Sequence, residues 1–88
     1  MNTYRHAFSA RCPRNGESII FKLSIQTEKM IYVEHIKTAC GMLREGYHEH
    51  MAEGLHAQFG GHLTLTANHH GVDIETVLGA GAKEASDA

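Results

Sequence analysis

Residues 18–26 of this 88-residue chain read SIIFKLSIQ, and this stretch decides the fold. Large apolar side chains stand at every second position, namely Ile19, Phe21, Leu23 and Ile25. Alternation with a period of two is typical of a β-strand that buries one face and exposes the other. The stretch is therefore expected to be a half-buried strand of a sheet.

Turn residues and changes in apolar spacing mark the other elements. Pro13 and the dipeptide Asn15-Gly16 favour a turn between this strand and an extended segment at 3–11, which together make a β-hairpin. The remaining expected elements are an extended run at 30–33, a helix from Glu34 that Gly46 ends or interrupts, a helix from Tyr47 to Phe59 closed by Gly60-Gly61, and strands at 63–66 and 72–77 joined by a turn at 69–71.

The order ββααββ predicts an α+β domain, with a four-stranded antiparallel sheet and two helices on one face. One domain is expected over residues 1–78, followed by a flexible C-terminal tail at 79–88. The second face and the open edges of such a sheet still need a partner, and a core this small is marginal on its own. We therefore expect a homo-oligomer in which sheet edges pair between subunits and close a barrel.

Composition limits the compartment and the partners. The formal net charge of −2 argues against a large nucleic-acid footprint. No apolar run reaches the roughly 18 residues of a membrane span, and residues 1–10 lack the apolar core of a signal peptide. Two cysteines, Cys12 and Cys40, fit free thiols in a reducing compartment. We expect a cytoplasmic protein with no membrane partner.

Three residues are candidates for chemistry. Cys12 follows the first strand between Arg11 and Arg14, so it is either a nucleophile with a lowered pKa or a small apolar filler. His48 and Glu49 open the second helix and could supply acid–base function and a carboxylate that binds a purine. The alternative for Glu49 is favourable electrostatics at a helix start.

Other polar residues favour structural interpretations. Glu34 stands where a strand would give way to the first helix, and either caps that helix or contacts a ligand. Cys40 falls on the apolar face of the same helix and is expected in the core. Although the chain has eight histidines, it shows no Cys-x-x-Cys, His-Glu-x-x-His or zinc-finger spacing, so no metal is expected. A composite site of Cys12 with His69 or His70 is the metal alternative.

Three segments in order carry a resemblance to a known family. They are Phe8-Ser9-Ala10-Arg11-Cys12-Pro13-Arg14-Asn15-Gly16, then Tyr47-His48-Glu49, then His69-His70-Gly71-Val72. Together, over most of the chain, they resemble the unimodular 7-cyano-7-deazaguanine reductases of queuosine biosynthesis. The resemblance implies the tunnelling fold, a barrel-like oligomer with sites between subunits, and a purine-like small-molecule substrate.

The same resemblance implies a role for each candidate residue. Cys12 would attack the nitrile of 7-cyano-7-deazaguanine to form a thioimide, which NADPH would reduce to 7-aminomethyl-7-deazaguanine. His48 would be a catalytic helper in proton transfer. Glu49 would bind the guanine-like edge of the substrate, and Glu34 would be a second substrate contact.

Departures from the family pattern keep alternatives open. The family aspartate seven residues after the cysteine is Ile19 here, and the arginine of the last segment is His69. The lysines tied to NADPH are missing in register from Glu34–Gly41, so the residues that would bind the cofactor are unknown. The alternatives are an amidinotransferase that forms archaeosine in tRNA without NADPH, a zinc enzyme similar to GTP cyclohydrolase, and a non-catalytic nucleobase-binding protein. The net charge does not favour tRNA.

Overall fold

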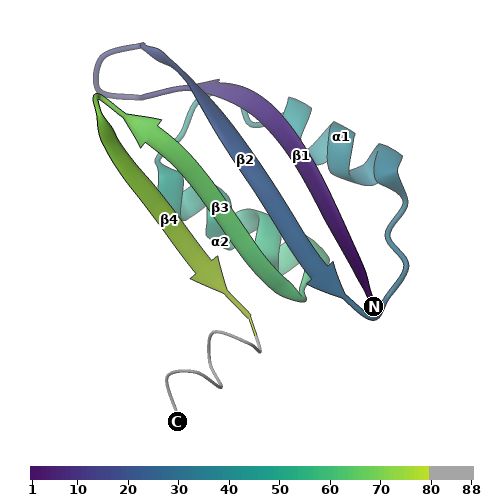
Figure 1. Ribbon diagram of the computed structural model, residues 1–88. Helices are drawn as coiled ribbons and strands as arrows, with labels where there is room; N and C mark the ends of the chain where they lie inside the picture. The colour runs from purple at the N-terminus through teal and green to yellow at the C-terminus, as the bar shows by residue number, and fades with distance from the viewer. Residues whose placement is uncertain (80–88) are drawn as a thin grey trace, which may run out of the picture.

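Four strands form one antiparallel sheet in the order β1-β2-β3-β4, and both helices lie on one face of it (Figure 1). This computed structural model describes residues 1–79, so the expected tail lies, apart from Gly79, outside the described residues. The elements are β1 (Asn2–Arg11), β2 (Ser18–Thr27), α1 (Val33–Gly41), α2 (His48–Phe59), β3 (His62–His69) and β4 (Val72–Leu78). The predicted order ββααββ is confirmed.

The period-two face of β2 forms the centre of the core. Ile19, Phe21, Leu23 and Ile25 are all buried, as their alternation predicts. The helices add apolar side chains from above this face, namely Ile36, Cys40, Met51, Ala52 and Leu55. Cys40 is thus a core residue, as expected, and burial raises the pKa of its thiol to about 11.

Two local boundaries differ from the prediction. The apolar run at 30–33 forms no strand: Tyr32 keeps an extended backbone as the N-cap residue, Val33 already begins α1, and Met30 and Tyr32 are exposed. The third strand continues to His69, so the turn shrinks to His70-Gly71, with φ angles of 54° and 87°. A two-residue turn with positive φ at both positions matches the twist of a hairpin, and glycine adopts this conformation without strain. His69 is therefore a strand residue on the helix-covered face.

Glu34 does not cap the first helix. The N-cap residue is Tyr32, which makes no side-chain capping hydrogen bond, and Glu34 lies in the first turn of α1. An acidic residue in the first turn still interacts favourably with the helix dipole. No helix within residues 1–79 is long and apolar enough to cross a membrane.

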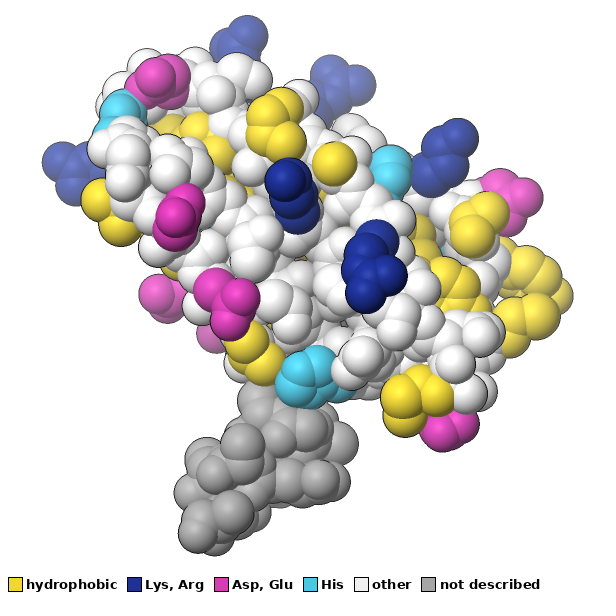
Figure 2. Space-filling view, in the orientation of Figure 1, with side chains coloured by type: hydrophobic (Ala, Val, Ile, Leu, Met, Phe, Trp, Pro, Cys, Tyr) yellow, Lys and Arg dark blue, Asp and Glu magenta, His cyan; other side chains and the backbone are white. Residues whose placement is uncertain are grey.

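The other face of the sheet carries no helix and is mostly polar. Figure 2 views this face and shows basic side chains over β1 and β2, with acidic side chains along β4. One row of neighbours across the strands explains the pattern, because Lys22 on β2 pairs with Thr66 on β3, which pairs with Glu75 on β4. We refer to this surface as the open face.

Two glycines should respond in opposite directions to substitution by alanine. Gly61 has a φ of +73°, and a Cβ there would lie 2.6 Å from the backbone oxygen of Gln26, so Gly61→Ala should lower the free energy of unfolding by about 2 kcal/mol or more. Gly54 lies within α2 with open space around it, so Gly54→Ala should raise that free energy by about 0.5–1 kcal/mol. Urea denaturation at one protein concentration measures both. Equal effects would contradict the assigned backbone conformation.

Candidate active site

A cavity of about 400 Å³ lies where the end of β1, the start of α2 and the β3–β4 hairpin meet. It is lined by Cys12, Pro13, Arg14, Gly46, Tyr47, His48, Glu49, His50, His69 and Ile74. Three of the four residues predicted for the site, Cys12, His48 and Glu49, therefore share one cavity.

Backbone hydrogen bonds bring these distant segments together. The Arg11 N–H donates to the Arg44 carbonyl at 2.8 Å, and the Gly46 N–H donates to the Arg11 carbonyl at 3.2 Å. These bonds hold the residues before α2 alongside the end of β1. As a result, His48 and Glu49 begin their helix next to Cys12.

Cys12 begins the β1–β2 loop, and backbone hydrogen bonds from Cys12 to Gly16 and Glu17 close that loop. Its N–H donates to the Glu17 carbonyl at 2.9 Å, and its carbonyl accepts from the Gly16 N–H at 2.8 Å. The side chain is half-buried and packs against the core, yet it still lines the cavity. Of the two thiols, only that of Cys12 reaches this cavity, whereas Cys40 lies in the core.

His48 is held as a neutral imidazole with one free nitrogen. Its side chain is only 5 % exposed, and its Nε2 lies 2.9 Å from the Leu65 carbonyl oxygen. Since a carbonyl only accepts, Nε2 carries the hydrogen and Nδ1 presents a lone pair, which has no partner among the described residues. Burial lowers the pKa of His48, against the hydrogen bond to Leu65, and nearby His69 lowers it further. Near neutral pH this residue is a proton acceptor.

His69 is a cavity residue that the sequence interpretation placed in a turn and considered only as an alternative metal ligand with Cys12. Its ring lies 5.7 Å from that of His48, measured between centroids, and its Nε2 is buried without a partner among the described residues. The Phe21 ring lies against both imidazoles, with centroid separations of 5.6 Å to His48 and 5.7 Å to His69. A signal was present, because His69 continues the every-second-residue pattern of Leu63, Leu65 and Ala67.

The structure places the other predicted positions away from this cavity. Ile19, at the position of the family aspartate, is buried in the core. Glu17 is exposed and its carboxylate lies 3.2 Å from His70 Nδ1, which joins the two hairpin loops. Glu49 is thus the only carboxylate among the residues that line the cavity.

Glu34 lies at the opposite end of β1 from Cys12. The segment before α1 is fixed there by a hydrogen bond from the Ile31 N–H to the Tyr4 hydroxyl, at 3.0 Å. Tyr4 and Cys12 are eight residues apart along an extended chain, which corresponds to roughly 26 Å. Within one chain Glu34 does not line the cavity, so a ligand contact from it requires another copy.

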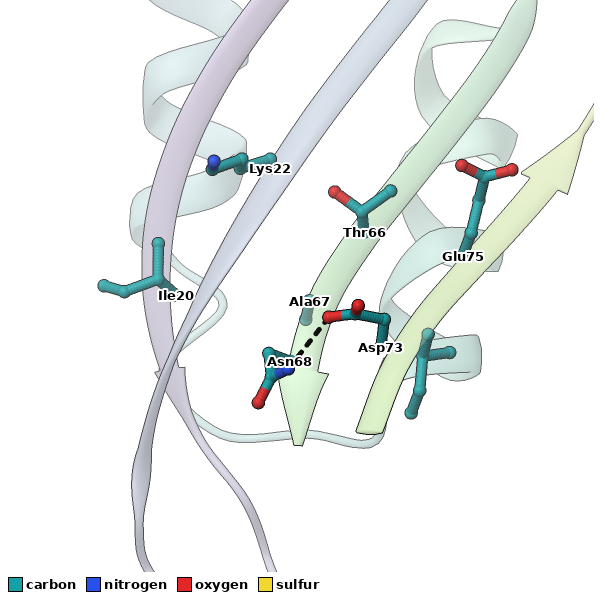
Figure 3. Close-up of a pocket in the computed structure, with 8 residues that line it drawn as sticks. Ile20, Lys22, Thr66, Ala67, Asn68, Asp73 and Glu75 are labelled. Atoms are coloured by element: carbon teal, nitrogen blue, oxygen red, sulfur yellow. Dashed lines mark hydrogen bonds between the residues drawn. The ribbon is translucent and has the colours of Figure 1, made fainter. Parts of the chain in front are cut away.

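A second hollow lies on the open face and has different chemistry. It has a volume of about 420 Å³, and Figure 3 shows Lys22, Thr66 and Glu75 around it. The Asn68 amide donates to the Asp73 carboxylate at 2.8 Å beside them. No thiol or imidazole lines this hollow. Within residues 1–79, no group of three or more histidine, cysteine, aspartate or glutamate side chains is placed to hold a metal ion.

The sheet, the helices on one face and the order ββααββ define the tunnelling fold. A solved structure with this architecture is the archaeosine synthase QueF-Like in the apo form, which superposes with a TM-score of 0.67 over 88% of this chain and 89% of that one. The sequence identity is 20%, so the likeness establishes the fold. A scan against models of known families finds no match to the sequence, and neither does a search of curated proteins.

The buried His48 predicts a specific pH dependence of stability. Its folded pKa lies below the ordinary value of 6.5, so on acidification the unfolded chain binds a proton before the folded protein does. The stability that this residue contributes is present above about pH 6.5 and is lost as the pH falls below that value. The difference in unfolding free energy between the protein and His48→Gln should therefore shrink from about pH 7 to about pH 5. A difference that grows over this range would contradict the assignment.

Proposed function

We propose that this chain is an enzyme of 7-deazaguanine chemistry that attacks the nitrile of 7-cyano-7-deazaguanine with the thiol of Cys12. The observation that carries the proposal is the single cavity shared by Cys12, His48 and Glu49. The fold shared with an archaeosine synthase supports it. So does the order of the three sequence segments.

Each of these three residues has a chemical task in the proposed reaction. The Cys12 thiolate adds to the polarised nitrile carbon and forms a thioimide. The Glu49 carboxylate accepts two N–H donors from the guanine-like edge of the substrate. Neutral His48, with a free Nδ1, accepts the proton that the thiol loses.

The second reactant is proposed to be ammonia or an amine. Attack of ammonia on the thioimide carbon forms an amidine and releases the Cys12 thiol. The residues present do not fit NADPH, because Glu34–Gly41 contains a single lysine, Lys37, and Arg14 is the only Lys or Arg side chain that lines the cavity. A 2′-phosphate usually needs more positive charge than this. Reduction to the aminomethyl product is the second candidate, favoured by the resemblance to the reductases.

Covalent capture tests the first step. On mixing with 7-cyano-7-deazaguanine, intact mass spectrometry should show an adduct of the full ligand mass on the protein. Cys12→Ala should show none. Cys40→Ala is the matched control and should keep the adduct, because the buried Cys40 has a raised pKa and does not line the cavity.

The outcomes separate the candidate functions. Loss of the adduct on addition of ammonia, with release of an amidine, supports the proposed second step, and consumption of NADPH favours the reductase. If the folded protein binds the ligand but forms no adduct, nitrile chemistry is excluded and a non-catalytic nucleobase-binding protein is favoured. Adduct formation on Cys12→Ala would also overturn the assignment.

We also propose a homo-oligomer in which β1 of one copy pairs with β4 of the next. Both strands are edges of the sheet within a chain. On the open face β1 carries Arg5 and Arg11, and β4 carries Asp73 and Glu75, so the two edges have opposite charge. Edge pairing would bury unpaired backbone groups and would close the barrel.

Charge reversal at the two edges tests this assembly. Analytical ultracentrifugation should show a species whose mass is a multiple of 9.7 kDa. Arg5→Glu and Glu75→Arg should each weaken assembly by about fivefold per interface, since an attractive pair of edges becomes repulsive. Combining the two changes should recover part of the loss. A monomer at all concentrations would overturn the proposal.

A further inference from the structure

We propose that His69 is the proton donor to the nitrile nitrogen, so that it replaces the acid missing at Ile19. This inference rests on the proposed function, because it assigns one further catalytic residue to the same cavity. It begins from two imidazole nitrogens, His48 Nδ1 and His69 Nε2, which are buried without partners among the described residues.

Two unpartnered buried nitrogens on one wall are unusual. Buried polar groups are almost always hydrogen-bonded, and leaving one unpaired costs about 1–3 kcal/mol. Both rings line the cavity that holds Cys12, and the buried Phe21 ring packs against both. The two nitrogens are therefore best explained as groups that gain partners only when a ligand is present.

The two imidazoles have complementary roles. His48 donates its Nε2 hydrogen to Leu65, which leaves an acceptor at Nδ1. The rings are 5.7 Å apart, so mutual repulsion disfavours a positive charge on both. Burial opposes charge on His48. We therefore assign the acceptor role to His48 and the donor role, as an imidazolium, to His69. The wall thus presents one acceptor and one donor.

This arrangement balances the addition step. The Cys12 S–H bond breaks and its proton passes to His48 Nδ1, while the sulfur forms a bond to the nitrile carbon. One C≡N π bond breaks, and the nitrogen takes the proton of His69 Nε2–H. The product is a neutral thioimide with a C=N–H group. His48 has then gained one proton and His69 has lost one, so transfer between the two rings restores the starting state.

Other charged groups around the cavity are compatible with this role. Glu49 and His50 line it from α2, and Arg14 lines it from the β1–β2 loop. The Glu17 carboxylate lies 3.2 Å from His70 Nδ1, and Glu17 is not among the residues that line the cavity. No carboxylate other than Glu49 lines the cavity, and Glu49 is assigned to the guanine-like edge. Among the lining residues, His48 and His69 are the two with a buried nitrogen that lacks a partner, and His48 is already the acceptor, so we assign protonation of the nitrogen to His69.

The test measures the rate constant of adduct formation with 7-cyano-7-deazaguanine, by rapid quench and intact mass spectrometry. His69→Gln keeps a hydrogen-bond donor but cannot release a proton, and its rate should fall by about 10²–10⁴-fold. His35→Gln makes the same chemical change at an exposed residue of α1 and should leave the rate unchanged. The rate for the unmodified protein should pass through a maximum with pH. That of His69→Gln should rise throughout, because the remaining acid–base group, His48, acts in its deprotonated form.

A second variant separates chemistry from structure. His69→Ala leaves space for free imidazole, which should restore part of the rate if the lost group is a proton donor. A rate for His69→Gln within threefold of the unmodified protein would overturn the role of His69 alone. A fall in rate with an unchanged shape of the pH profile and no imidazole rescue would assign His69 a structural role and would also overturn the proposal. Absence of any adduct on the unmodified protein would instead remove the proposed function, and this inference with it.

Discussion

The packing of the Phe21 ring against His48 and His69 is the interaction on which the site depends. Phe21 is almost completely buried, and its ring stacks on that of Phe8, with 5.4 Å between the ring centroids. An aromatic ring fixed in this way has little freedom to move, so the imidazoles that contact it are held in place before any ligand arrives. The same side chain therefore belongs to the hydrophobic core and to the wall of the candidate active site. Stability and preorganisation of the site depend on one residue.

The alternation along the strands divides the molecule into two surfaces with different tasks. The helix-covered face holds the core and, at one end, the cavity with Cys12. The open face keeps polar and charged side chains in rows, such as Lys22, Thr66 and Glu75. Because both helices cover the other face, Lys22 and Glu75 of these rows remain exposed to solvent. The fold thus places the thiol and the polar rows on opposite sides of one layer.

The sequence alone was sufficient for the architecture, because strong periodicity in β2 and regular spacing in α2 leave few alternatives. The sequence is less informative at short segments: the run at 30–33 is only apolar and forms no strand, and the two turn residues after His69 hide that it continues the alternation of β3. For the site, the sequence singles out Cys12, His48 and Glu49, which line one cavity. The chemical roles of these residues remain predictions. Their proximity depends on backbone bonds between residues 11 and 44–46, which no local pattern encodes.

Neither helix begins with a capping side chain: Tyr32 and Tyr47 occupy the N-cap positions and make no side-chain bond to the helix. A helix of 12 residues without a cap is marginal as an isolated peptide in water. The segment that carries His48 and Glu49 should therefore gain its helical form only when it docks on the finished sheet. On this view the two β-hairpins form early, and the reactive cavity is completed in the last stage of folding. A partly folded chain would expose the Cys12 thiol without the groups that direct its chemistry.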